Sequence, residues 1–86
     1  MKALHKKTGL ELEVITSLDE HTKVGLSIEA MYNHVPDGVT MEWIGKTWDM
    51  SKQRIEDTGL YEAVVLDEGS INGTMSVYLD EVEPLI

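Results

Sequence analysis

The chain has 86 residues, of which 42% are hydrophobic, with a net charge of −9 and no cysteine. This length fits a single domain, spanning residues 1–86, with a small core. The lack of cysteine excludes disulfides, thiolate catalysis and cysteine-ligated metal centres. The negative charge argues against direct binding to nucleic acid, because it repels phosphate groups.

The first seven residues, MKALHKK, are basic, and glutamates interrupt the apolar residues of the next segment, TGLELEVI. A secretory signal needs an unbroken apolar segment, and a membrane-spanning helix needs about 20 apolar residues. We therefore expect a cytoplasmic protein with no membrane association.

Two early segments alternate apolar and polar residues, as strands with one buried face do. They are LELEVI (10–15) and KVGLSIEAMY (23–32). The polar segments SLDEHT (17–22) and NHVPDG (33–38) are typical of turns. The pattern predicts two strands, each followed by a turn.

The segment TMEWIGKTWDMS (40–51) has the pattern of a β-hairpin. A glycine at the first position of a two-residue turn favours a type II′ turn at Gly45-Lys46. That register pairs Trp43 with Trp48 across the strands. It places four large side chains on one face, namely Met41, Trp43, Trp48 and Met50.

One short helix is predicted at SKQRIEDTG (51–59). Ser51 can cap its N-terminus, and Gly59 can supply the left-handed residue that ends it. Two turns are too few to be stable alone, so this helix should lie over one end of a sheet.

Later strands are predicted at LYEAVVLD (60–67) and TMSVYLDEVE (74–83), and Pro84 should end the pairing. The whole chain is thus predicted to be mainly β. The expected fold is a small curled antiparallel sheet, or an SH3-like open barrel, of five or six strands with one short helix.

The segment LDEGSINGTMSVYL (66–79) resembles a calcium-binding loop, because Glu68, Ser70 and Asn72 alternate before Gly73. The position that requires a bidentate glutamate is Leu79, and the flanks alternate like strands. Asn-Gly is the preferred dipeptide of a type I′ turn. We therefore interpret the segment as a hairpin with its tip at Asn72-Gly73.

Catalytic and metal-binding motifs are weak in this sequence. Asp19, Glu20 and His21 are adjacent in a predicted surface turn, where they would not converge on one ion. The histidines, His5, His21 and His34, lack metal-ligand spacing. No serine lies in a nucleophile-elbow pattern, although a serine–histidine–aspartate triad is not excluded. We expect no enzymatic activity, no metal and no cofactor.

The opening MKALHKKTGLELEVI and the later GKTWDMS resemble segments of short uncharacterised proteins encoded by phages and other mobile elements. In those proteins a lysine-rich strand, a Thr-Gly turn and a Glu/Val strand form a first hairpin. The resemblance covers about 20 residues of hairpin pattern. It implies a small SH3-like or open β-barrel and a phage-borne accessory protein, and it transfers no functional residue.

Two surfaces are candidate partner-binding sites. The first is the face formed by the two methionines and two tryptophans of the predicted hairpin, which is either ordinary core or a partly exposed patch suited to an interface. The second is a predicted acidic edge at the C-terminal hairpin. It consists of Asp67, Glu68, Asp80, Glu81 and Glu83.

The sequence therefore predicts a non-enzymatic module that binds a protein with a basic surface. The specific version is a phage-encoded inhibitor of a host nucleic-acid-handling or defence protein, acting in the host cytoplasm by occlusion or DNA mimicry. The alternatives are a structural or assembly component, which can form a homo-oligomer, and a small-ligand-binding domain. The acidic surface is equally compatible with a role in solubility alone.

Overall fold

The computed structural model describes the backbone of residues 1–31 and 41–85 and the side chains of residues 1–26 and 44–85. The expected turn at residues 33–38 lies outside the described residues. The elements, in chain order, are β1 (Lys2–His5), β2 (Glu11–Val14), α1 (Leu18–Met31), α2 (Met41–Thr58), β3 (Tyr61–Asp67), β4 (Ser70–Val77), the 3₁₀ helix η1 (Leu79–Glu81) and β5 (Val82–Pro84).

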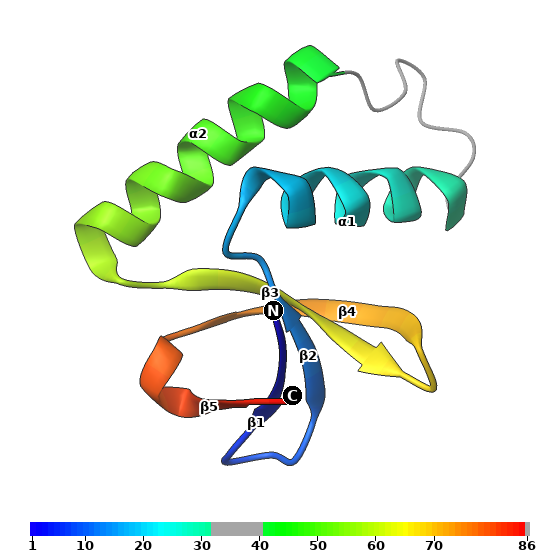
Figure 1. Cartoon of the computed structure of the whole chain (residues 1–86), viewed down its shortest axis with the longest axis vertical. Helices are drawn as coiled ribbons and strands as arrows, with labels where there is room; N and C mark the ends of the chain where they lie inside the picture. The colour runs from blue at the N-terminus through cyan, green and yellow to red at the C-terminus, as the bar shows by residue number, and fades with distance from the viewer. Residues whose placement is uncertain (32–40, 86) are drawn as a thin grey trace.

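The strands form one antiparallel five-stranded sheet in the order β4-β3-β2-β1-β5, and both helices lie on one side of it (Figure 1). The predicted antiparallel sheet is confirmed. An SH3-like barrel is not confirmed, because in the described chain the sheet is open, with β4 and β5 as its separate edges. The fold also has two long helices where one short helix was predicted.

The main core cluster lies on one face of the sheet. It includes Leu12 and Val14, together with Ala63, the cross-strand partner of Val14. Val77 and Val82, from opposite edges of the sheet, belong to the same cluster, so the sheet curls around it. Each fully buried aliphatic side chain contributes about 1.5–3 kcal/mol. This curled layer is therefore the stable base on which the helices rest.

The first hairpin has the expected strands and turn. The amide of His5 donates to the carbonyl of Leu10 at 2.8 Å, and Gly9 takes the left-handed backbone with φ 74°. The β1–β2 hairpin predicted at Thr8-Gly9 is confirmed.

The strand predicted at residues 23–32 is wrong, because most of it belongs to helix α1. Ser17 caps this helix, since its Oγ accepts the amide of Glu20 at 3.2 Å. Two acidic residues in the first turn favour a helix through its dipole. Residues two apart point about 200° away from each other on a helix, so Val24 is half-buried while Leu26 is 49% exposed.

The hairpin predicted at residues 40–51 is also wrong, because α2 runs through Gly45 without interruption. The buried side chains follow helical spacing: Ile44 is 1% and Ser51 is 6% exposed, with half-buried Trp48 between them. The short helix predicted from Ser51 is the C-terminal half of α2. Its end is confirmed, since Gly59 has φ 78° and its amide donates to Ile55.

The β3–β4 hairpin is confirmed, but its predicted tip is misplaced. Glu68 and Gly69 form the two-residue turn, with φ 52° and 82°, as a type I′ turn requires. Asn72-Gly73 lies inside β4 opposite Val65, where the register shifts and Gly73 has φ 106°. The Asn-Gly pair therefore forms a bulge, not the turn.

The C-terminal strand was predicted to extend continuously to residue 83, and this is wrong. β4 ends at Val77, η1 turns the chain, and β5 pairs with β1 at the far edge of the sheet. Pro84 opposes Ala3 in this ladder, and pairing continues as the Leu85 amide donates to Lys2 at 2.9 Å. A proline is tolerated here because an edge strand needs no donor on its outer side.

Candidate functional site

The predicted face of methionines and tryptophans does not form, because all four residues lie in α2. Trp48 packs against His21 with ring centroids 5.8 Å apart, whereas Met50 is 73% exposed. Trp48 and Met50 are two residues apart, and the side chains of such residues point in directions about 200° apart around a helix. The backbone of Met41 and Trp43 lies in α2, and their side chains are outside the described part.

The five predicted acidic residues do not share one edge. Asp67 and Glu68 lie at the β3–β4 turn. Asp80 and Glu81 lie in η1, and Glu83 lies in β5, the strand at the opposite edge of the sheet (Figure 1). The expectation of a single acidic edge is wrong, because β5 leaves the hairpin and pairs with β1.

Two of these acidic residues are also involved in local structure. The Nζ of Lys6 donates to the Asp80 carbonyl at 3.1 Å, and the Glu81 carboxylate accepts the Tyr78 amide at 2.8 Å. The second contact closes the first turn of η1. Lys6 is therefore held against the backbone of η1.

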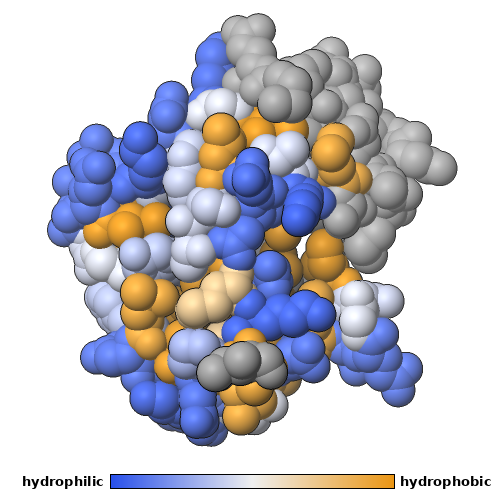
Figure 2. All heavy atoms as spheres, in the orientation of Figure 1, coloured by the Kyte–Doolittle hydropathy of each residue, from blue (hydrophilic) through white to orange (hydrophobic). Residues whose placement is uncertain are grey.

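A cleft of about 530 Å³ lies between α1, α2 and the sheet. Its sheet side includes Val64 of β3 and Thr74 of β4, which are on the face opposite the core. Ile15, Val24 and Met50 supply apolar walls. On the face in Figure 2, apolar residues form separate patches among hydrophilic ones. The cleft beneath the helices thus has walls that are mainly apolar.

His21 forms one wall of the cleft and is only 8% exposed. Its Nε2 lies 2.7 Å from Thr47 Oγ1, a bond that ties α1 to α2, and its Nδ1 is buried without a partner. Burial lowers the pKa of His21 below its ordinary value of 6.5, and the nearby Glu62 carboxylate opposes this effect. The ring is therefore neutral at neutral pH.

A second polar group faces the cleft from α2 and β3. Ser51 Oγ donates to Glu62 at 3.4 Å, and the Arg54 guanidinium lies 3.7 Å from the same carboxylate. The Nε of Arg54 is buried and unpaired. These contacts fix α2 against β3 and leave a cation, a carboxylate and a neutral imidazole around one apolar hollow.

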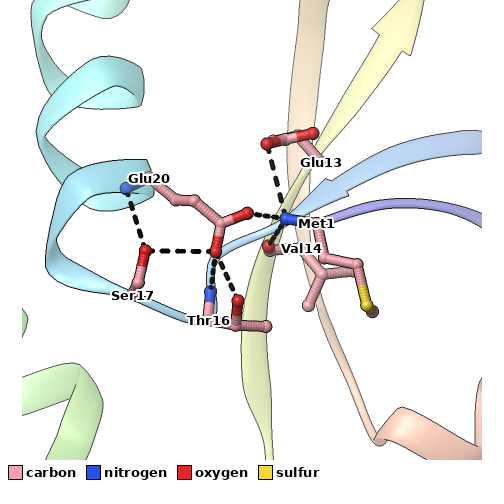
Figure 3. Close-up of polar contacts among 6 residues, drawn as sticks. All are labelled: Met1, Glu13, Val14, Thr16, Ser17 and Glu20. Atoms are coloured by element: carbon pink, nitrogen blue, oxygen red, sulfur yellow. Dashed lines mark hydrogen bonds and ion pairs between the residues drawn. The ribbon is translucent and has the colours of Figure 1, made fainter.

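The position of α1 depends on Glu20 (Figure 3). Its carboxylate accepts the Thr16 amide at 2.9 Å, contacts the Thr16 and Ser17 hydroxyls, and forms an ion pair with the amino group of Met1. That amino group also donates to the Val14 carbonyl at 2.7 Å. The start of α1 is thereby tied to β2, and the cleft depends on this connection.

The described contacts do not assemble a nucleophilic relay. His21 is bonded to Thr47, and Ser51 is bonded to Glu62. In residues 1–26 and 44–85, no hydrogen bond joins a serine to a histidine. Within those residues no three side chains of histidine, aspartate or glutamate gather as metal ligands. The arrangement is suited to holding a bound group by hydrogen bonds within an apolar cleft.

Sequence reasoning did not find His21, Thr47, Arg54 or Glu62 as neighbours. The signals that could have found α1 and α2 were the Ser17-x-x-Glu20 capping box and the helical spacing from Ile44 to Ser51. No known protein family, curated protein or solved structure matches this chain. In the described part, no helix is long and apolar enough to span a membrane.

Proposed function

We propose that this protein is a non-catalytic binding module for a protein with a basic surface. The observation that carries the proposal is Met50, which is 73% exposed beside the cleft of a domain with net charge −9. Exposed methionine suits adaptable protein interfaces, because its side chain is flexible and polarisable.

Charge and apolar contact have separate roles in this proposal. The excess of carboxylates accelerates encounter with a basic partner, and the helical layer around Met50 slows its release. Leu18 and Leu26 add exposed apolar area on α1, at 44% and 49% exposure. In the narrower form, the partner is a nucleic-acid-handling or defence protein whose basic groove the acidic domain occludes.

The test is affinity capture with the wild-type protein and two variants, Met50→Ser and Leu85→Ser. Leu85 is 45% exposed beyond β5, away from the helices, and serves as the matched control. We expect the wild-type protein and Leu85→Ser to capture the same basic protein, and high salt to release it. Met50→Ser should bind this partner about tenfold more weakly. Binding that is indifferent to salt and to Met50→Ser would contradict it.

A second candidate function, assembly into a larger particle or homo-oligomer, is supported by the edge strand β4. This strand has eight residues and no charged side chain, whereas the opposite edge, β5, has three residues including Glu83 and Pro84. Uncharged edges invite pairing with another strand, although the bulge at Gly73 limits this.

Sedimentation velocity over a range of concentrations tests the assembly function. If the protein assembles, a species larger than the monomer should be present. Ser76→Lys should abolish this larger species, and Gln53→Lys, on the exposed surface of α2, should leave it intact. A monomer at every concentration, or equal effects of both lysines, would eliminate pairing through β4.

A further inference from the structure

Asn72 and Gly73 interrupt the pairing of β4, the strand at one edge of the sheet (Figure 1). The register of β3 and β4 shifts at this point, so that both residues oppose Val65 and neither has a cross-strand partner. A bulge of this kind disrupts the ladder locally. The outer side of β4 has no neighbouring strand in the described part of the chain. The backbone is therefore held less tightly here than in the paired parts of β4.

The two residues are also open to water. Both are exposed, and Gly73 has the left-handed backbone with φ 106°. A Cβ placed on Gly73 would meet no atom within 4 Å. The backbone nitrogen of Gly73 can therefore approach the side-chain carbonyl carbon of Asn72, Cγ, without displacing a neighbour. Glycine itself puts no side chain in the way of this approach.

We propose that Asn72 is a site of spontaneous deamidation in the folded protein. The backbone nitrogen of Gly73 gives up its proton to solvent and attacks Cγ of Asn72. The new C–N bond closes a succinimide ring, the C–N bond of the side-chain amide breaks, and its nitrogen takes up a proton and leaves as ammonia. Water then opens the ring at either of its two carbonyl carbons. The products are aspartate and isoaspartate.

The reaction changes the charge of the sheet edge. In the unmodified chain no residue of β4 (Ser70–Val77) is charged. Either product adds a carboxylate to this strand, and charged side chains on an edge strand oppose pairing with another strand. The modification itself depends on neither of the functions proposed above, because its chemistry involves only this chain and water.

The rate of the reaction in the folded protein tests the proposal. Wild-type protein is incubated at neutral pH, and peptide mass spectrometry with chromatography measures the aspartate and isoaspartate forms of residue 72. The same protein unfolded in urea gives the reference rate. We expect the two rates to agree within about tenfold, because a disrupted ladder opens at little cost in free energy. A pair held in an intact ladder would react only after global unfolding, at least about a thousandfold more slowly.

A variant and an internal reference identify the site. Asn72→Gln lengthens the side chain by one methylene group, which makes ring closure unfavourable, and it should remove the conversion. The second asparagine of the sequence, Asn33, precedes His34. In the unfolded chain Asn33 should react more slowly than Asn72, since the Cβ of the following residue hinders the attack.

Either of two results would overturn the proposal. A rate in the folded protein more than about tenfold below that of the unfolded chain would show that the fold protects Asn72. Equal conversion of the wild-type protein and Asn72→Gln would place the reaction at another residue. If Asn72→Gln does not fold, the position of the modified residue in the wild-type peptides and the two wild-type rates still decide the outcome.

Discussion

Replacing Glu20 should separate helix α1 from the sheet. Glu20→Ala removes the acceptor of the amide of Thr16, the residue before the N-cap Ser17, and such a hydrogen bond is worth about 1 kcal/mol. It also removes the ion pair with the Met1 amino group, where the two side chains are 21% and 30% exposed. A partly exposed pair contributes up to about 1 kcal/mol. We therefore expect a loss of about 2 kcal/mol.

For a domain of this size, that loss corresponds to a decrease in Tm of roughly 8–16 °C. Glu20→Gln keeps an oxygen for the Thr16 amide but not the charge, so about half of the loss should remain. The free energy of unfolding of Glu56→Gln, on the exposed surface of α2, should be within about 0.5 kcal/mol of the wild-type value.

Urea denaturation followed by circular dichroism gives the free energy of unfolding, and native-state hydrogen exchange locates the change. We expect α1 amides to lose protection before those of β2 and β3, because the network joins the start of α1 to the sheet. Either a loss below about 0.5 kcal/mol for Glu20→Ala, or equal losses for the alanine and glutamine variants, would refute this reasoning.

Three further predictions test the core, the helices and the buried histidine. Leu12→Ala should cost about 2–5 kcal/mol in urea denaturation, because Leu12 is fully buried in the core cluster. Gly45→Ala should raise the free energy of unfolding by about 0.4–1 kcal/mol, since Gly45 is inside α2 and an added Cβ contacts nothing within 4 Å. The control Gly69→Ala, at φ 82°, should lower the free energy of unfolding. A loss of stability in Gly45→Ala would instead support the hairpin predicted at residues 40–51. Because burial lowers the folded-state pKa of His21 below 6.5, the unfolded state binds more protons in that window, and stability should fall as the pH decreases from about 7.5 to about 5.5. Thermal unfolding should show a smaller fall in His21→Phe, and an equal fall would contradict the assignment.

The strands could be predicted because local and tertiary signals agree in them. In β2 and β3 the alternation places Leu12, Val14 and Ala63 on the core face, and the turn at Gly9 has the required glycine. The end of α2 was equally readable, since Gly59 stops the helix in the left-handed conformation.

The helices were missed because their sequences also satisfy a strand pattern. Residues 23–32 alternate, and Gly45-Lys46 has the chemistry of a tight turn, yet helical caps and packing decided the structure. Ser17 caps α1, and Ile44 and Ser51 become buried only when α2 is helical. Alternation alone did not separate the two outcomes.

The candidate site could not be predicted from the sequence, because its members come from separate elements. His21 and Thr47 are 26 residues apart and meet only when α1 lies beside α2. Arg54 and Glu62 meet only after the chain turns at Gly59 into β3. Once strands had been assigned to both helical segments, no reading of residue types could bring these side chains together.

The protonation state of the His21 ring tests the central claim, that α1 and α2 pack around a buried, neutral histidine. A long-range ¹H–¹⁵N correlation spectrum at neutral pH reports both ring nitrogens. We expect a neutral ring that is in contact with the Trp48 ring. A charged ring, or the absence of contacts between the two rings, would contradict this packing of the helices.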